Sequence, residues 1–319
     1  MAQRIVRTAL AWPWRVSPVA TLALIVVSQP VAGYAPGPTS AGASPAAPIA
    51  TTSAPCIDLA PGEQTLTVVA DGVTRSVLVH VPVAANTAAP MPAMIALHGY
   101  STEAADFAQT SQLPAIADEV GFIVAFPQGL GATPYWNVVG PDTSSADPTR
   151  PDREFVNGVI DLLVASDCVD PSRIFLAGHS MGGGMTGDLA CQIGDRLAGI
   201  GLMSAMALHP PCQPPRPLGV FVSHAMDDDV LPYLGGTIAG APDNYPKQLP
   251  VEDAVRGWAT GEGCTPSTDL TVPGAVEALI TFVGCAAPVE FDRRSTGGHE
   301  WSVAAGGEMV RFFLSLPPG

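Results

Sequence analysis

The sequence has few charged residues, and basic residues are the scarcest of them. Only 13% of the 319 residues are charged, and 14 Lys and Arg stand against 29 Asp and Glu, which gives a formal net charge of −15. Because proteins bind nucleic acids through Lys and Arg that neutralise phosphates, this balance argues against a nucleic-acid partner. An acidic surface is compatible with a soluble enzyme that acts on a neutral substrate.

A long apolar run is also missing from the N-terminal region. The mainly apolar residues 19–27 rise only roughly 1.5 Å each in a helix, too little to cross a bilayer core of about 30 Å. They follow Arg4, Arg7 and Arg15 and precede small residues, which is the layout of a secretory signal peptide. We therefore expect a signal peptide over residues 1–33, a secreted protein and no stable membrane partner. An uncleaved membrane anchor is the alternative.

The six cysteines include no C-x-x-C pair, the spacing typical of zinc sites. We therefore expect no metal site, and no sequence motif indicates a cofactor. An even number of cysteines in an exported protein favours disulfides instead. Cys264 and Cys285 flank one short segment and are predicted to pair. The other four can pair in several ways: Cys56, Cys168, Cys191 and Cys212.

The chain divides by composition into three parts. After the predicted signal peptide, residues 34–55 are almost all Ala, Pro, Ser, Thr and Gly and are expected to form a flexible linker. Residues 56–319 are expected to form one α/β catalytic domain, because apolar runs without period-2 alternation alternate with helical patterns. The predicted architecture is a mostly parallel, doubly wound sheet with helices on both faces.

The predicted elements follow the chain in order. Strands are expected at 66–69, 75–81, 93–97, 122–126, 173–177, 199–204, 218–223, 278–283 and 289–292. The Asp71-Gly72 pair predicts a hairpin between the first two strands. Helices are expected over one continuous stretch that includes Ala105 and Ala117, and at 155–164, 180–192, 251–260 and 309–314.

Gly178-His179-Ser180-Met181-Gly182 lies where an apolar strand ends and a helical pattern begins. A G-x-S-x-G sequence in that context predicts a nucleophile elbow, a sharp turn that exposes a serine to a base and to a carbonyl group. Glycines at both ends suit so tight a turn, because a side chain there would collide with the neighbouring backbone. The alternative interpretation is an ordinary exposed serine in a Gly-rich turn.

The chain also offers an acid and a histidine in the order that an α/β-hydrolase triad requires. One of three aspartates, Asp227 to Asp229, follows the strand at 218–223, and His299 follows the strand at 289–292. His299 would take the proton of Ser180, and the acid would orient its ring. The chain order favours His299 over the remaining histidines, which are His80, His98, His179, His209 and His224.

An oxyanion hole is expected beside the nucleophile. The backbone N–H of the residue after the serine, Met181, is the first donor. The turn His98-Gly99-Tyr100 ends another predicted strand, and the N–H of Tyr100 is the expected second donor.

At these residues the chain resembles a known family. Over roughly residues 60–315 it is similar to the polyhydroxybutyrate depolymerase and feruloyl esterase family of secreted α/β-hydrolases. The resemblance rests on Leu97-His98-Gly99, Cys168-Val169-Asp170-Pro171-Ser172-Arg173, Gly178-His179-Ser180-Met181-Gly182-Gly183, Asp228 with Val230-Leu231-Pro232-Tyr233 and Gly235-Gly236, and Gly297-Gly298-His299-Glu300-Trp301. It implies a serine esterase whose acid is Asp228, although Ala225 and Met226 replace the usual Gly-Thr before it.

Three aromatic residues are predicted to bind the substrate. Tyr135 and Trp136 lie in the long loop 127–152, and Trp301 lies two residues after the proposed base. Aromatic walls beside a serine suit a flat or apolar acyl group, so the expected partner is a neutral ester, polymeric or not. The alternative is that these rings only anchor the loop. An acyltransferase, a serine peptidase or a silent binding protein on the same fold are the competing functions.

Overall fold

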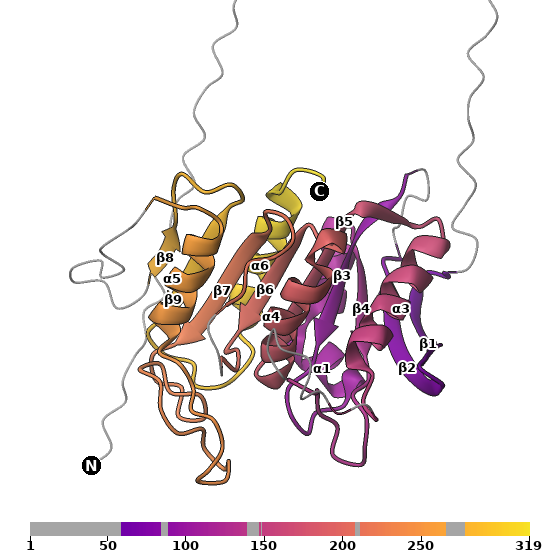
Figure 1. Ribbon diagram of the computed structural model, residues 1–319. Coiled ribbons are helices and arrows are strands. Elements are labelled where there is room, and N and C mark those ends of the chain that lie inside the picture. Colours follow the sequence, from indigo (N-terminus) through magenta and orange to yellow (C-terminus); the bar gives the residue numbers. More distant parts are fainter. Residues whose placement is uncertain (1–58, 84–88, 139–146, 148, 208–210, 266–277) are drawn as a thin grey trace, which may run out of the picture. The chain divides into compact units, whose positions relative to one another are not determined.

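The computed structural model describes residues 59–83, 89–138, 147, 149–207, 211–265 and 278–319. The predicted signal peptide and linker lie outside these ranges. The described residues form a nine-stranded sheet with the order β1-β2-β4-β3-β5-β6-β7-β9-β8 (Figure 1). The six strands β4, β3, β5, β6, β7 and β9, in their order across the sheet, run parallel to one another, and β1, β2 and β8 pair antiparallel at the two edges. The predicted fold class, a mostly parallel α/β sheet, is confirmed.

The strands are β1 (Gly62–Ala70), β2 (Val73–Val81), β3 (Met91–Leu97), β4 (Ile123–Pro127), β5 (Val169–His179), β6 (Gly199–Met203), β7 (Gly219–Ala225), β8 (Ala278–Thr281) and β9 (Val289–Arg294). The helices are α1 (Ala104–Ser111), α2 (Leu113–Val120), α3 (Asp152–Ala165), α4 (Met181–Ile193), α5 (Val251–Gly261) and α6 (Val303–Ser315), with a short 3-10 helix η2 (Gly194–Arg196). Most predicted elements are present, with ends that differ by a few residues.

The predicted hairpin at the N-terminal edge is confirmed. Asp71 and Gly72 both have positive φ angles, 46° and 80°, as a two-residue turn between twisted strands requires. Across this turn Ala70 pairs with Val73, and the register continues to Gly62 opposite Val81.

The helix predicted around Ala105 to Ala117 is two helices, which corrects the sequence-based expectation. Gln112 adopts a left-handed conformation, with φ of 57°, between α1 and α2. Pro114 is the physical reason, because a proline inside a continuous helix lacks the required N–H and clashes with the preceding turn. In the first turn of α2, Pro114 loses no helical hydrogen bond and meets no preceding turn, so it is tolerated there.

Helices cover both faces of the sheet. On one face, α3, α4 and α5 contribute Phe155, Leu189 and Trp258 to a buried apolar cluster, and these helices lie in front of the sheet in Figure 1. On the other face, α1, α2 and α6 pack a second cluster in which Phe175 stacks on Phe313 with ring centroids 4.6 Å apart. Each fully buried aliphatic or aromatic side chain contributes about 1.5–3 kcal/mol to folding.

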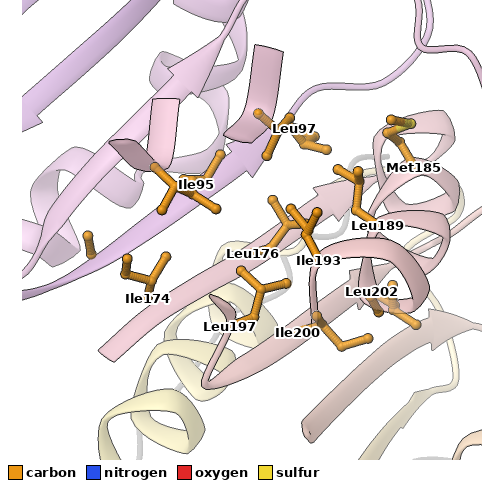
Figure 2. Close-up of a cluster of buried hydrophobic side chains, with 14 of the residues drawn as sticks. Ile95, Leu97, Ile174, Leu176, Met185, Leu189, Ile193, Leu197, Ile200 and Leu202 are labelled. Carbon is orange, nitrogen blue, oxygen red and sulfur yellow. The ribbon is translucent and has the colours of Figure 1, made fainter. Parts of the chain in front are cut away.

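Helix α4 packs on the centre of the sheet. Figure 2 shows Leu189 and Ile193 of this helix beside Leu176 of β5, all three at most 5% exposed. This packing holds α4 against the central strand. The turn between β5 and α4 is therefore fixed from both sides, and it carries Ser180.

Disulfides add covalent links outside the sheet. Cys264 and Cys285 are bonded, as predicted, and Cys191 is bonded to Cys212. Cys168 is also disulfide-bonded, and Cys56 lies outside the described residues. None of the helices in the described ranges combines the length and apolar character needed to cross a membrane.

Candidate active site

Ser180 occupies a sharp turn between β5 and α4. Its φ of 56° and ψ of −119° are uncommon for a residue with a side chain and hold it out of the regular helix. A Cβ at Gly178 would collide with the backbone of Gly182, and a Cβ at Gly182 would collide with the backbone oxygen of Leu97. The predicted elbow geometry is present, and the glycines make it possible.

Ser180, His299 and Asp228 meet at the carboxyl edge of the sheet. The Oγ of Ser180 lies 2.8 Å from Nε2 of His299, and Nδ1 of His299 lies 2.9 Å from Oδ2 of Asp228. The Asp228 side chain is fully buried, whereas 18% of the His299 side chain is exposed. A serine, a histidine and a carboxylate in this chain of hydrogen bonds can activate the serine hydroxyl by proton transfer.

The environment of Asp228 favours its ionised form. Burial by itself would raise the pKa of this carboxyl group, but hydrogen bonds from His224, His299 and the N–H of Leu231 outweigh burial and lower the pKa well below its usual range. Oδ1 accepts the N–H groups of Val230 and Leu231 at 3.0 and 2.8 Å. The carboxylate is therefore fixed in direction and charged when it faces the imidazole.

The two neighbouring aspartates have different positions. Asp227 is exposed and accepts the N–H of Gly298 at 2.9 Å, so it holds the loop that carries His299. Asp229 is exposed as well. The register proposed from the sequence therefore coincides with the buried aspartate that faces His299.

His179 has a position that the sequence reasoning did not use. Its Nε2 donates to the backbone oxygen of His299 at 2.7 Å, and its ring stacks on Phe107 and meets Trp301 edge-on. Burial, followed by the nearby His299, lowers the pKa of His179 to about 4, so the ring is neutral near neutral pH. The hydrogen bond from the neutral ring of His179 to the backbone oxygen of His299 links the elbow turn to the loop that carries His299. The only signal in the sequence was its place next to Ser180.

The turn after β3 is held by buried hydrogen bonds. Nδ1 of His98 donates to the backbone oxygen of Gly99 at 2.7 Å, and Nε2 accepts the N–H of Gly129 at 2.9 Å. The indole N–H of Trp136 donates to the backbone oxygen of His98 at 2.8 Å. This turn carries Tyr100, the predicted second oxyanion donor, to the same pocket as Ser180 and Met181.

Met181 is the first residue of α4. The first N–H groups of a helix have no partner within that helix and carry partial positive charge. An oxygen that becomes negative beside Ser180 can therefore be stabilised there. Within the described ranges, no group of three His, Cys, Asp or Glu side chains is arranged to hold a metal ion.

A pocket of about 390 Å³ opens beside Ser180. Tyr100 and Met181 line it on the nucleophile side, and Met206 and the segment 230–245 line the rest. The described lining residues are mainly apolar and include no charged side chain. Sequence reasoning missed this segment, because a loop between a strand and a helix shows no pattern that predicts which way its apolar residues face.

Two of the three predicted substrate-binding aromatics are packing residues, which corrects that prediction. Trp136 is 1% exposed and Trp301 is 9% exposed, and neither lines the pocket. Trp136 anchors the turn at His98, and Trp301 packs edge-on against Phe107 with ring centroids 5.2 Å apart. Large aromatic rings favour such positions because they bury more apolar area in the core than they would in the wall of an open pocket.

Tyr135 differs from the two tryptophans. It is half-buried, its ring lies over the guanidinium of Arg150 at 3.4 Å, and it lies 6.5 Å from the ring of Tyr100. Its role in binding stays a prediction. His209, one of the alternative bases, lies outside the described residues.

A buried polar network links the strands that lead into the site. Nε of Arg294 donates to Oγ of Ser223 at 3.0 Å, and one of its terminal nitrogens donates to Oγ of Ser204 at 3.3 Å. Ser223 in turn donates to Asp292 at 2.8 Å. These contacts join the ends of β6, β7 and β9, from which the loops bearing Asp228 and His299 depart.

Known proteins resemble this chain in sequence. Residues 76–211 match the family model described as "Esterase PHB depolymerase". Feruloyl esterase B of Piromyces equi is 31% identical over 63% of this chain and 38% of its own length. The bifunctional acetylxylan esterase/xylanase XynS20E of Neocallimastix patriciarum is 28% identical over 54% of this chain and 24% of its own length. The chain thus spans well under half of these two relatives.

Solved structures support the fold independently. An acetyl xylan esterase from Aspergillus awamori superposes with a TM-score of 0.58 over 78% of this chain and 98% of that one, at 15% identity. At so low an identity the match concerns the fold alone, which is the α/β-hydrolase fold. Over residues 76–211, which include the elbow, the chain is thus similar to the polyhydroxybutyrate depolymerase and feruloyl esterase-like family, and its fold is that of the α/β-hydrolases.

Proposed function

We propose that the protein is a serine esterase that hydrolyses carboxylic esters through Ser180, His299 and Asp228. The observation that carries this proposal is the continuous hydrogen-bonded chain from Oγ of Ser180 through both nitrogens of His299 to Asp228. The family match over residues 76–211 supports it, as does the similarity to two relatives that are named as esterases.

The proposed reaction begins when Nε2 of His299 removes the proton of Ser180 while Oγ attacks the ester carbonyl carbon. The carbonyl oxygen becomes negative and accepts hydrogen bonds from the N–H groups of Met181 and Tyr100. His299 then protonates the leaving alcohol oxygen, the carbon–oxygen bond breaks, and an acyl-serine forms. Asp228 keeps the proton of His299 on Nδ1 and stabilises the imidazolium.

The second half of the reaction uses water in the same way. His299 removes a proton from water, the hydroxide attacks the acyl carbon, and the tetrahedral intermediate again places its oxygen at the two N–H groups. Collapse of this intermediate returns the proton from His299 to Oγ of Ser180 and releases the carboxylic acid. Each proton taken up by His299 is given back, so the enzyme is regenerated.

The proposed substrate is a neutral ester, either a hydroxycinnamoyl ester of plant polysaccharide or a short hydroxyalkanoate polyester. The mainly apolar, uncharged pocket lining supports a neutral acyl group, and the net charge of −15 disfavours anionic polymers. The names of the relatives, a feruloyl esterase and an acetylxylan esterase, motivate the two ester classes.

The direct test is Ser180→Ala, with Ser315→Ala as the matched control because Ser315 is exposed at the end of α6. We expect Ser180→Ala to abolish turnover of p-nitrophenyl acetate, a loss of several orders of magnitude, with little change in thermal stability. A fluorophosphonate should label the wild type and the control but not the variant. Residual activity above about a tenth of wild type would contradict the proposal.

A substrate panel separates the remaining possibilities. Methyl ferulate, a hydroxybutyrate oligomer and p-nitrophenyl acetate report the acyl preference, and an added alcohol or a peptide substrate reports transfer or proteolysis. Labelling of Ser180 without turnover of any substrate would instead favour a silent binding protein.

We further propose that residues 1–33 are a cleaved signal peptide, that residues 34–55 are a linker, and that the domain at 56–319 is secreted. The disulfides at Cys191 and Cys264 support an oxidising compartment. N-terminal sequencing of the exported protein tests the cleavage, and recovery of the full chain in the membrane fraction would indicate an uncleaved anchor.

A further inference from the structure

A second, smaller cavity lies between α4 and α5. It has a volume of about 50 Å³ and is lined mainly by apolar residues, among them Val222, Val255 and Trp258. On the α4 side the lining residues are glycines, which include Gly184 and Gly187. A Cβ built at Gly187 would meet only Trp258, at 3.8 Å, so this part of the helix leaves room for a ligand or for a larger side chain.

The polar side chains of this cavity are already bonded to the protein. His224 contacts the backbone oxygen of Leu231 at 2.9 Å and the carboxylate of Asp228 at 3.2 Å. Gln248 accepts the N–H of Ala207 at 2.8 Å and donates to the backbone oxygen of Ala205 at 3.1 Å. Because these groups are used, the space favours an apolar occupant over a polar one.

Met206 lies between the two cavities. Among the described residues that line them, it alone belongs to both. Its N–H donates to the backbone oxygen of Ser180 at 2.9 Å, which fixes its position beside the nucleophile. Met206 is 8% exposed and packs in an apolar cluster with Leu231 and Ile238. The Met206 side chain therefore separates the larger pocket from the smaller cavity. A methionine is unbranched and changes rotamer more easily than a branched residue, which suits this position.

The larger pocket is the side of the site where an acyl group would lie. His299 must reach the leaving alcohol oxygen to protonate it, so the alcohol leaves on the His299 side. The described residues that line the pocket include Ser180, Met181 and Tyr100 but not His299. The acyl group therefore extends away from His299 into this pocket, toward Met206.

We propose that Met206 is a specificity-determining residue that limits acyl-chain length, and that the cavity between α4 and α5 accepts the distal methylenes of an aliphatic acyl chain once this side chain is removed. The inference rests on the proposed esterase function. It assigns to the cavity a ligand class, a linear saturated hydrocarbon chain, that matches its lining.

The test compares kcat/KM for p-nitrophenyl butyrate and p-nitrophenyl decanoate. We expect Met206→Ala to raise the decanoate-to-butyrate ratio on the order of tenfold, because added methylenes gain an apolar site. Met206→Leu keeps the volume and is the matched control, and its ratio should stay within about twofold of wild type. Filling the cavity in the double variant Met206→Ala with Gly187→Leu should remove the gain.

The outcomes are distinct. An unchanged ratio in Met206→Ala, with butyrate turnover retained, overturns the inference and leaves the esterase proposal intact. A gain that persists when Gly187→Leu fills the cavity also overturns it, because the chain would then lie elsewhere. If wild type turns over neither ester and Ser180 resists a fluorophosphonate, the proposed function fails and the inference falls with it.

Folding of the variants is checked by thermal unfolding. Should Met206→Ala fail to fold, Met206→Val opens the same partition with a smaller loss of volume, and Gly187→Ala fills the cavity by a single carbon atom. We expect Met206→Val to raise the decanoate-to-butyrate ratio and the added Gly187→Ala to lower it again. Equal ratios in wild type and all variants overturn the inference.

Discussion

Asp228 differs from Asp227 and Asp229 in burial and in its contact with His299. Replacing each singly by Asn tests the assignment, because Asn keeps the size but removes the charge. We expect Asp228→Asn to lower kcat by about 10⁴, since the imidazole would lose its tautomer and its counter-charge. Asp227→Asn should lose far less, because the amide oxygen still accepts the N–H of Gly298. A collapse of kcat in Asp227→Asn or Asp229→Asn would show that the register is wrong.

His179 is a positioning residue in the same site. Replacing it by Leu removes the donor to the backbone oxygen of His299, and we expect kcat to fall about a hundredfold with KM nearly unchanged. His179→Gln should restore much of kcat, because the Gln amide can donate to the same oxygen. A purely structural role would predict equal losses in both variants and a shared fall in thermal stability, so the kcat and KM values decide between them.

At the scale of elements, the Cys264–Cys285 disulfide joins the end of α5 to the connection between β8 and β9. The bonded cysteines are 21 residues apart, and closing a loop of that size contributes on the order of 3 kcal/mol. The double variant Cys264→Ser with Cys285→Ser should lose about that much in urea-induced unfolding while esterase activity at low temperature persists. Free thiols found by alkylation of the unreduced wild type would contradict the pairing.

At the scale of the whole molecule, buried histidines make stability depend on pH. Burial lowers the pKa of His98 from 6.5 to about 4, and this histidine is 0% exposed. Between these two pKa values the unfolded chain binds a proton that the folded protein does not, so acid favours unfolding. The free energy of unfolding therefore keeps its full value above pH 6.5 and decreases as the pH approaches 4, by roughly 3 kcal/mol in total.

The measurement is the free energy of unfolding in urea across that pH window. Wild type should lose stability as pH falls, and His98→Gln should show a shallower slope, whatever its absolute stability, because Gln does not titrate. His179, whose pKa is also lowered to about 4, should act in the same direction. Equal slopes for wild type and His98→Gln would contradict the assignment.

Much of the site could be predicted from the sequence because the evidence for it is local. The strand, the two glycines and the helical pattern around Ser180 are neighbours in the chain, and His299 follows the last predicted parallel strand. The catalytic roles of these residues stay predictions until the variants are measured. The division into helices α1 and α2 could also have been predicted, since Pro114 is a helix-breaking residue.

The fold class, the order of the strands along the chain and the residues at the elbow turn follow from local patterns in the sequence, because hydrophobic periodicity and glycine sterics act over short distances. Packing in three dimensions was needed to establish that Asp228 is the aspartate that faces His299, which the resemblance had only implied, and that the rings of Trp136 and Trp301 are buried. It also decided that the segment 230–245 lines the pocket. The physical reason is that burial and hydrogen bonding depend on which distant segments pack together, and no local pattern encodes that choice.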